Sequence, residues 1–336
     1  MEEAWAALED GDPERALELS ERALAAGGED LDAHRCRAAA LADLRRFDDA
    51  EDAYRAALEI SPDEPLLHLE LAELLATSRS ADEGALEDAL ELARRGQDLA
   101  GDDAELAADL SIVKAMAHNG LGDPEAALQA LADARGEVGR RADVLIEEGA
   151  ALFELCRFPE ARKALEDAVK KAPDDPWANH LLGLVLERAG DEKAARKRFD
   201  QARRLAPEDF PEPVRLTPEE FDRAVKEAVE RLPGEIRRHL GEVLISVQAL
   251  PADVDLMEGR ERAHSPSILG IFRGASLRER AASGELPPAI FLYQKNLERI
   301  ASTREELIEQ IERTVIHEVG HLIGFSEEDL HDRGLE

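Results

Sequence analysis

Apolar positions in the first two-thirds of the chain recur as a small, bulky, small pattern at helical spacing. Three copies are clearest, RRFDDAEDAYRAALEISPDEP, CRFPEARKALEDAVKKAPDDP and GDEKAARKRFDQARRLAPEDF. The aligned residues are Ala50, Tyr54 and Ala57, then Ala161, Leu165 and Ala168, then Ala195, Phe199 and Ala202. Residues three and four apart share one face of an α-helix, so the pattern predicts amphipathic helices that pack closely through alanine.

The spacing of these copies indicates a repeat of fixed length. Pro173 and Pro207, which close the last two copies, are 34 residues apart. This period resembles the tetratricopeptide (TPR) family, which implies helix pairs stacked into a solenoid whose concave face holds a peptide or partner protein. Extra residues are expected in longer loops near 76–84 and 136–141. The six expected repeats, the first incomplete, cover 1–30, 31–64, 65–103, 104–141, 142–175 and 176–209.

Four prolines between Ala206 and Glu219 mark the expected end of the repeats, because proline interrupts helices. Thr217 and Pro218 then begin a new helix, as its cap and first-turn residue. Apolar stretches near 243–248, 268–273 and 289–294 predict short strands, with a loop at 251–266. We therefore expect a mostly α chain, with a repeat solenoid over 1–209 and a small α+β domain over 210–336.

The last predicted helix lies between Ser302 and Gly324. Ser302 and Glu305 have the spacing of a capping box, and Gly324 is a natural helix stop. The apolar residues between them recur at helical intervals; they are Leu307, Ile308, Ile311, Val315, Ile316, Val319, Leu322 and Ile323.

This helix contains the sequence HEVGH, which fits the H-E-x-x-H pattern of zinc-dependent hydrolases. Residues four apart lie about 6 Å along a helix and about 40° around it, so His317 and His321 can bind one Zn²⁺ ion. Glu318 lies beside that ion and can act as the general base that takes a proton from a zinc-activated water.

A zinc site needs a third protein ligand, and the acid three positions after Gly324 is Glu327. This spacing matches H-E-x-x-H-x-x-G-x-x-ligand, so Glu327 is the first choice for the third ligand. Glu328, Asp329 and His331 are the alternatives.

The segment HEVGHLIGFSEEDL resembles the end of the small bacterial zincin-like metallopeptidases, and the resemblance covers about residues 210–336. Upstream segments that share it are FDRAV, VLISV, ILGIF and LPPAIFLY. The chain departs from that family in having Glu327 where an aspartate is usual. As in the rest of the family, no methionine turn follows the motif. Tyr293, at the end of the last strand, is expected to be a half-buried strand residue; the alternative is a residue that lines the cleft or stabilises an oxyanion.

Acidic residues dominate the composition, with 75 Asp and Glu against 42 Lys and Arg and a net charge of -33. The acidic excess on both sides of residue 207 argues against DNA, RNA and anionic membranes as partners. No signal peptide and no apolar run of about 18 residues is visible. Cys36 and Cys156 lack zinc-site spacing, so we expect reduced thiols in a cytoplasmic protein.

Together these features predict a zinc metallopeptidase whose TPR array recruits a substrate or a regulator. The alternative is a TPR interaction scaffold whose zincin domain binds metal but is weakly active or inactive.

Overall fold

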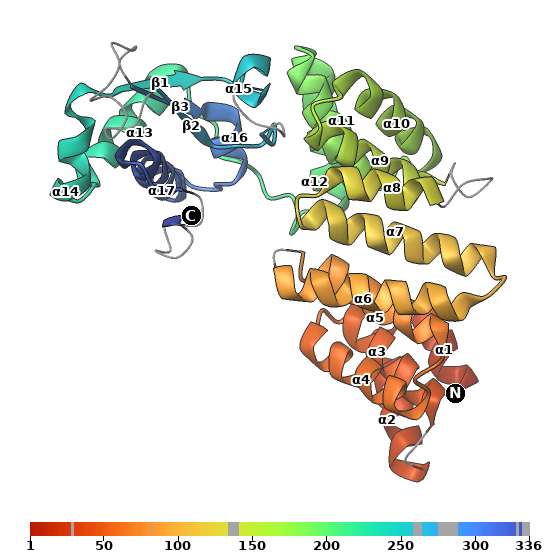
Figure 1. Cartoon of the computed structure of the whole chain (residues 1–336). Coiled ribbons are helices and arrows are strands. Elements are labelled where there is room, and N and C mark those ends of the chain that lie inside the picture. Colours follow the sequence, from red (N-terminus) through yellow and green to blue (C-terminus); the bar gives the residue numbers. More distant parts are fainter. Residues whose placement is uncertain are drawn as a thin grey trace. The chain divides into compact units, whose positions relative to one another are not determined.

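A computed structural model describes residues 1–27, 30–80, 82–133, 141–257, 264–274, 288–326 and 329–330 of the chain. The chain divides into two compact units, Met1–Asp174 and Asp175–Glu336. Over these described ranges the first unit consists of helix hairpins, and the second of one more hairpin followed by a small domain with a three-stranded sheet (Figure 1). The fold is therefore mostly α, with a repeat solenoid followed by a small α+β domain, as the sequence predicted.

The hairpins follow the repeat pattern pair by pair. In the first unit they are α1 (Glu2–Glu9) with α2 (Pro13–Gly27), α3 (Leu31–Asp43) with α4 (Phe47–Ile60), α5 (Pro65–Ser78) with α6 (Glu83–Ala100), α7 (Ala104–Gly120) with α8 (Pro124–Asp133), and α9 (Ala142–Glu154) with α10 (Phe158–Lys171). The second unit begins with the sixth hairpin, α11 (Pro176–Arg188) and α12 (Glu192–Leu205). Each hairpin lies within one of the six expected repeats.

The recurring alanines lie in the core of the hairpins, which explains their small size. All of the aligned alanines are buried, namely Ala50, Ala57, Ala161, Ala168, Ala195 and Ala202. Tyr54 and Leu165 are buried as well, whereas Phe199 in the sixth hairpin remains partly exposed. The sixth hairpin therefore has a different environment from the hairpins inside the array.

One turn position in the hairpins adopts the left-handed backbone conformation. Gly11, Gly122 and Gly190 have φ values of 75°, 69° and 78° there, and Arg45 and Cys156 have φ values of 57°. Glycine adopts this conformation without a Cβ penalty, whereas other residues pay about 1–2 kcal/mol. Arg45 and Cys156 therefore carry strain at a position where the other hairpins use glycine.

The expected long loop near 76–84 is wrong in detail, because most of the extra residues lengthen a helix. α5 ends at Ser78, and α6 begins at Glu83 and runs for 18 residues, against 14 in α4. The Asp82 carboxylate caps α6 by accepting a hydrogen bond from the backbone N–H of Ala85 at 3.2 Å. The other expected loop, near 136–141, lies outside the described residues except for Arg141.

The sheet of the second unit has the strand order β1-β3-β2. Its strands are β1 (Leu244–Gln248), β2 (Gly270–Arg273) and β3 (Ala289–Tyr293). β1 pairs parallel to β3, with Leu244 opposite Ala289, and β2 pairs antiparallel to β3, with Gly270 opposite Leu292. The three strands lie where the sequence predicted them.

A short helix, α15 (Asp253–Met257), occupies part of the segment expected to be a loop. The backbone N–H of Ala252 donates to the Asp255 carboxylate at 3.0 Å, which caps the helix. Asp255 is fully buried and forms an ion pair with Arg273 on β2. This helix thus depends on a partner from a distant strand, which local sequence could not reveal.

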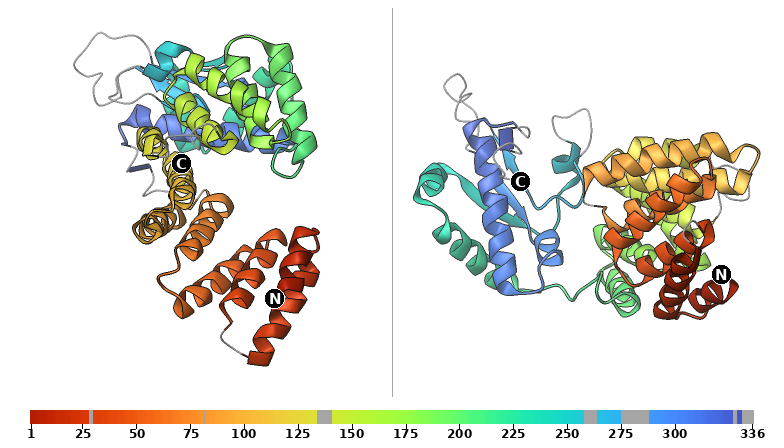
Figure 2. Two further views of the ribbon diagram at one scale, coloured as in Figure 1. Left: turned by 90° about the vertical axis from the view of Figure 1, so that its right-hand side faces the viewer. Right: turned by 90° about the horizontal axis from the view of Figure 1, so that it is seen from below.

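The remaining helices of the second unit are α13 (Pro218–Arg231), α14 (Gly234–Arg237), the 3-10 helix η2 (Arg238–Glu242), α16 (Gln294–Arg299) and α17 (Arg304–Ile323). α13 begins with the predicted cap, since Thr217 and Glu220 form a capping box. α13 and α17 share one apolar core with β3, and Figure 2 shows α17 alongside the strands. That core includes Phe221, Ile290, Ile311 and Val319.

The start of α17 differs from the prediction by one residue. The capping box is formed by Thr303 and Glu306, not by Ser302 and Glu305. Both pairs have the required spacing, but Glu305 is engaged by Arg231 of α13 at 2.5 Å. The end of the helix agrees with the prediction, because Gly324 adopts the left-handed conformation with φ 93°.

No helix in the described ranges combines the length and the apolar character that crossing a membrane requires.

Candidate metal centre

α17 brings the two predicted histidine ligands together on one side of the helix. Nε2 of His317 and Nε2 of His321 are 3.1 Å apart, with the two rings inclined at 79°. Two nitrogen ligands at about 2.0–2.1 Å from a tetrahedral zinc ion are about 3.3 Å apart. The two imidazoles thus fit a single ion with almost no rearrangement.

The orientation of His321 is fixed by the turn that ends α17. Its Nδ1 lies 3.2 Å from the carbonyl oxygen of Phe325, which can only accept a hydrogen bond. Nδ1 therefore carries the proton, and Nε2 keeps its lone pair for a metal. Gly324 makes this arrangement possible, because its left-handed conformation turns the chain so that the Phe325 N–H reaches the carbonyl of Gly320 at 3.0 Å.

Glu318 is buried beside the histidines, with only 5% of its surface exposed. On β3, Tyr293 is fully buried, not half-buried as expected. Burial raises the pKa of the Tyr293 phenol to about 12, Arg273 lowers it, and the Glu318 carboxylate raises it further. The phenol is therefore a neutral hydrogen-bond donor at ordinary pH.

The Tyr293 hydroxyl has no hydrogen-bond partner among the residues that the structure describes. A buried polar group without a partner costs about 1–3 kcal/mol, so such groups are uncommon in native proteins. Glu318, the candidate base, is one of the charged groups that shift the pKa of this hydroxyl.

The segment after Gly324 has hydrogen bonds of its own and packs on α17 through Leu330. The backbone N–H and hydroxyl of Ser326 donate to Oδ2 of Asp329 at 3.0 and 2.9 Å. Leu330 is fully buried and packs on Gly320, where an added Cβ would lie 2.3 Å from Cδ2 of Leu330. A side chain at position 320 would thus displace the segment that carries the expected third ligand.

Of the four candidates for the third ligand, only Asp329 is described. It is exposed, and its carboxylate caps the Ser326 turn. Glu327, Glu328 and His331 lie outside the described residues. Among the residues that are described, no group of three or more His, Cys, Asp or Glu could hold a metal ion, so the third ligand stays a prediction.

β2 contributes two close contacts that the sequence pattern did not predict. Gly270 lies against α17, where an added Cβ would be 2.7 Å from Cγ2 of Thr314. At the other end of β2 the guanidinium of Arg273 lies 4.6 Å from the centre of the Phe291 ring and pairs with Asp255. Neither contact follows from local spacing, because each joins elements that are separated in the chain.

Comparison with protein families agrees with this geometry. The family model of the zincin-like metallopeptidases matches residues 240–335. The tetratricopeptide repeat model matches residues 1–65 and 146–210. The chain joins TPR repeats to a zincin-like metallopeptidase domain.

Solved structures similar to this chain are TPR proteins or contain comparable arrays. PilW, a widely conserved type IV pilus biogenesis factor, is 16% identical over 62% of this chain and 92% of its own, with a TM-score of 0.52. Pseudomonas aeruginosa pilF is 16% identical over 62% and 90%, with a TM-score of 0.48. YrrB, a TPR protein with an unusual peptide-binding site, is 16% identical over 57% and 94%, with a TM-score of 0.38. The curated proteins contain no match to this chain.

Proposed function

We propose that the zincin-like domain is a zinc-dependent peptidase in which His317, His321 and Glu327 hold one zinc ion. The observation that carries this proposal is the 3.1 Å separation of the two Nε2 atoms, combined with the Phe325 carbonyl that fixes the tautomer of His321. Two imidazoles and one carboxylate are a ligand set that catalytic zinc sites use.

Glu318 would act as the general base and acid of peptide-bond hydrolysis. When bound, zinc supplies a Lewis acid that activates water and polarises the scissile carbonyl. Glu318 takes the proton from the attacking water and passes it to the leaving amine. Its burial supports this role, because a carboxylate shielded from bulk water is well placed to hold a proton during the reaction.

Glu327 remains the first choice for the third ligand on the spacing of the motif. Asp329 caps the Ser326 turn through Oδ2 alone, so it stays among the alternatives. Glu328 and His331 are the remaining competitors.

The repeat array would recruit a protein substrate or a regulator, since TPR repeats are interaction modules. The acidic charge excludes nucleic acid and anionic membranes from this proposal. A cytoplasmic location accords with a chain that has only two cysteines, Cys36 and Cys156, far apart in sequence and without zinc-site spacing.

Zinc content per purified chain tests the metal site directly. We expect about one zinc ion per wild-type chain, unchanged in His331→Ala and lost in Glu327→Ala. Zinc retained in Glu327→Ala but lost in His331→Ala would assign the third ligand to His331. A wild-type chain that takes up no zinc from a zinc-supplemented buffer would overturn the proposal.

Activity separates the peptidase from the metal-binding scaffold. With fluorescein-labelled casein as the substrate, the zinc-loaded wild type should release labelled peptides and Glu318→Gln should not, although it keeps its zinc. Glu309→Gln, an exposed position on the same helix, is the matched control and should behave as wild type. Zinc-loaded wild type without any cleavage would favour the scaffold.

A further inference from the structure

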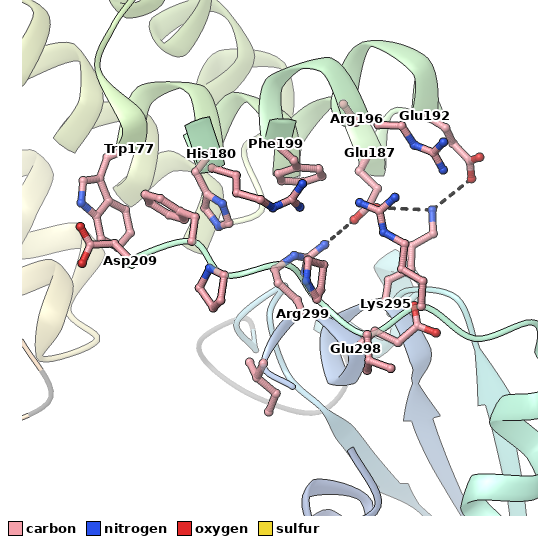
Figure 3. A pocket seen from close by; sticks show the side chains of 18 residues that line it. Trp177, His180, Glu187, Glu192, Arg196, Phe199, Asp209, Lys295, Glu298 and Arg299 are labelled. Carbon is pink, nitrogen blue, oxygen red and sulfur yellow. Dashed lines mark hydrogen bonds and ion pairs between the residues drawn. The ribbon is translucent and has the colours of Figure 1, made fainter. Parts of the chain in front are cut away.

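A pocket of about 430 Å³ lies beside the sixth hairpin, away from the residues of the candidate metal centre (Figure 3). It is lined by α11, α12, the proline-containing segment 209–215 and α16, all within the second unit. Of the predicted zinc-site residues that the structure describes, neither His317 nor His321 lines it.

The pocket has a structural origin in the end of the repeat pattern. Tyr54 and Leu165, at equivalent positions in earlier repeats, are buried, whereas the equivalent Phe199 is partly exposed and lines the pocket. The segment 209–215 and α16 follow the sixth hairpin in place of another hairpin. They cover its end incompletely, which leaves the pocket.

One end of the pocket is an aromatic wall. Phe210 stacks on His180, with ring centres 4.7 Å apart, and meets Trp177 edge-on at 4.9 Å. Burial lowers the pKa of His180 to about 4, so its ring is neutral at physiological pH. Trp177 is 55% exposed, although its side chain is large and apolar. This wall therefore offers uncovered apolar surface to a ligand.

The opposite end is charged, and its acids are already engaged. Glu187 pairs with Arg299 at 2.5 Å and with Lys295 at 3.5 Å, and Lys295 also pairs with Glu192 at 3.0 Å (Figure 3). The Glu298 carboxylate accepts hydrogen bonds from the Leu216 N–H and the Gln294 side chain.

Two arginines that line the pocket have no such partner. Among the described residues neither Arg196 nor Arg215 makes a hydrogen bond or an ion pair, although Arg196, after Lys295, helps to lower the pKa of the Glu192 carboxyl. Both side chains are exposed, and the chain that carries them has a net charge of -33. An exposed arginine without an ion pair can bind a carboxylate group through paired hydrogen bonds from its guanidinium.

We propose that this pocket binds a peptide segment in which a phenylalanine-like side chain is flanked by carboxylates. The aromatic wall would hold the apolar side chain, and Arg196 and Arg215 would hold the carboxylates. The proposal stands without any zinc chemistry. Because α16 follows Tyr293 directly, a peptide held here would be attached to the domain that carries the candidate metal centre.

Trp177 provides a reporter for the test, because the chain has only one other tryptophan, Trp5. In the full chain with Trp5→Phe, the fluorescence of Trp177 is followed while the blocked peptide EEFEE is added. We expect a saturable change, with binding about tenfold or more tighter than for KKFKK or EEAEE.

Charge reversal then assigns the binding to the pocket. Arg196→Glu with Arg215→Glu should weaken EEFEE binding by about tenfold or more. Lys193→Glu with Lys197→Glu makes the same charge change at exposed positions of α12 that do not line the pocket, and should have little effect. Equal loss in both double variants, or no preference for EEFEE over KKFKK and EEAEE, would overturn the proposal. All these substitutions are at the surface, and circular dichroism would check that each variant is folded.

Discussion

At the scale of single residues, several side chains lie in conformations or environments that lower the free energy of unfolding. Substitution of each residue measures the size of its effect. Cys156 is one of them, since it is held at φ 57° in a turn where Gly190, 34 residues later, has the same conformation. Its thiol lies 4.0 Å from the carbonyl oxygen of Glu154.

Cys156→Gly should therefore raise the free energy of unfolding by about 0.5–1 kcal/mol, since the left-handed strain disappears and part of the gain is offset by glycine's extra freedom when unfolded. Urea denaturation followed by circular dichroism would measure it. Cys156→Ala keeps the strain and is the control. Equal stabilisation by alanine and glycine would show that the backbone is not the cause.

Tyr293→Phe removes a buried hydroxyl that has no partner among the described residues. We expect the variant to be more stable by up to about 1 kcal/mol. If the hydroxyl stabilises the oxyanion of the reaction, the alternative raised by the sequence, the peptidase kcat should also fall about tenfold with unchanged zinc content. A loss of stability would instead reveal a structural partner for the hydroxyl. Denaturant unfolding and steady-state kinetics measure the two effects separately.

His180 makes stability depend on pH. Burial lowers the pKa of the folded imidazole to about 4, below the unfolded value of about 6.5, so acid protonates the unfolded state first. The contribution of His180 to the free energy of unfolding is fully present above pH 6.5. It falls by up to about 3 kcal/mol as the pH drops towards 4. His180→Phe should remove this contribution, whereas His239→Phe should not. Unfolding free energies at pH 7 and pH 4.5 would show the difference, and an unchanged pH dependence in His180→Phe would contradict it.

At the scale of elements, α17 is the structure on which the candidate centre depends. It supplies both histidines and Glu318, and its last turn fixes His321 through the Phe325 carbonyl. Leu330 packs on Gly320 of this helix, and this contact holds the end of the following segment in place.

Gly320→Ala should consequently weaken zinc binding by about tenfold, because the new methyl group displaces Leu330 and with it the segment expected to carry the third ligand. Helix stability should not suffer, since alanine favours helix. Competition with a fluorescent zinc chelator would measure the affinity. The double variant Gly320→Ala with Leu330→Ala makes room for the methyl group and should restore part of the zinc affinity. A Gly320→Ala variant that binds zinc as tightly as wild type would contradict the packing argument.

α16 is a second central element, because it connects several distant segments. The Lys295 N–H donates to the carbonyl of Ala249 at 3.0 Å, and the Asn296 side chain donates to the carbonyls of Pro266 and Ile268 at 3.0 and 2.7 Å. Lys295 and Arg299 also pair with Glu187 of α11. This short helix therefore joins the ends of β1 and β3, the segment before β2 and the sixth hairpin.

At the scale of the whole molecule, the chain passes from the first compact unit to the second between Asp174 and Asp175. The expected domains, 1–209 and 210–336, place the sixth hairpin with the repeats, as its sequence pattern implies. Contacts nevertheless join it to the zincin-like domain, since Arg188 donates to the Pro251 carbonyl at 3.1 Å and pairs with Asp253 at 3.0 Å. The hairpin is thus a repeat in sequence and part of the second unit in packing.

We expect α12 and α17 to unfold together. Arg299→Ala, which leaves the largely buried Glu187 with only the longer ion pair to Lys295, should lower the opening free energy of both helices by about 1–2 kcal/mol. Hydrogen exchange measured peptide by peptide would test this. Leu41→Ala, in the core of the first unit, is the control and should leave both helices unchanged. An effect of Arg299→Ala confined to α11 and α12 would show that the hairpin unfolds separately.

Much of the fold was accessible from local patterns. The alanine period located the hairpins, proline and glycine located their ends, and apolar stretches located the three strands. These features depend on interactions between residues close in the chain, as Thr217 with Glu220 in the cap of α13 illustrates. At the start of α17 two capping boxes have the required spacing. The one that ends at Glu306 forms, because Glu305 is hydrogen-bonded to the distant Arg231.

The sequence by itself determined which residues can meet around a metal, because His317, Glu318 and His321 lie within two turns of one helix and helix geometry sets their relation. Tertiary structure alone decided that Tyr293 is buried near Glu318, that Leu330 packs on Gly320, and that a pocket with two unpaired arginines remains beside the sixth hairpin. These features join segments far apart in the chain. Their positions follow from packing of the whole unit, which no local pattern encodes.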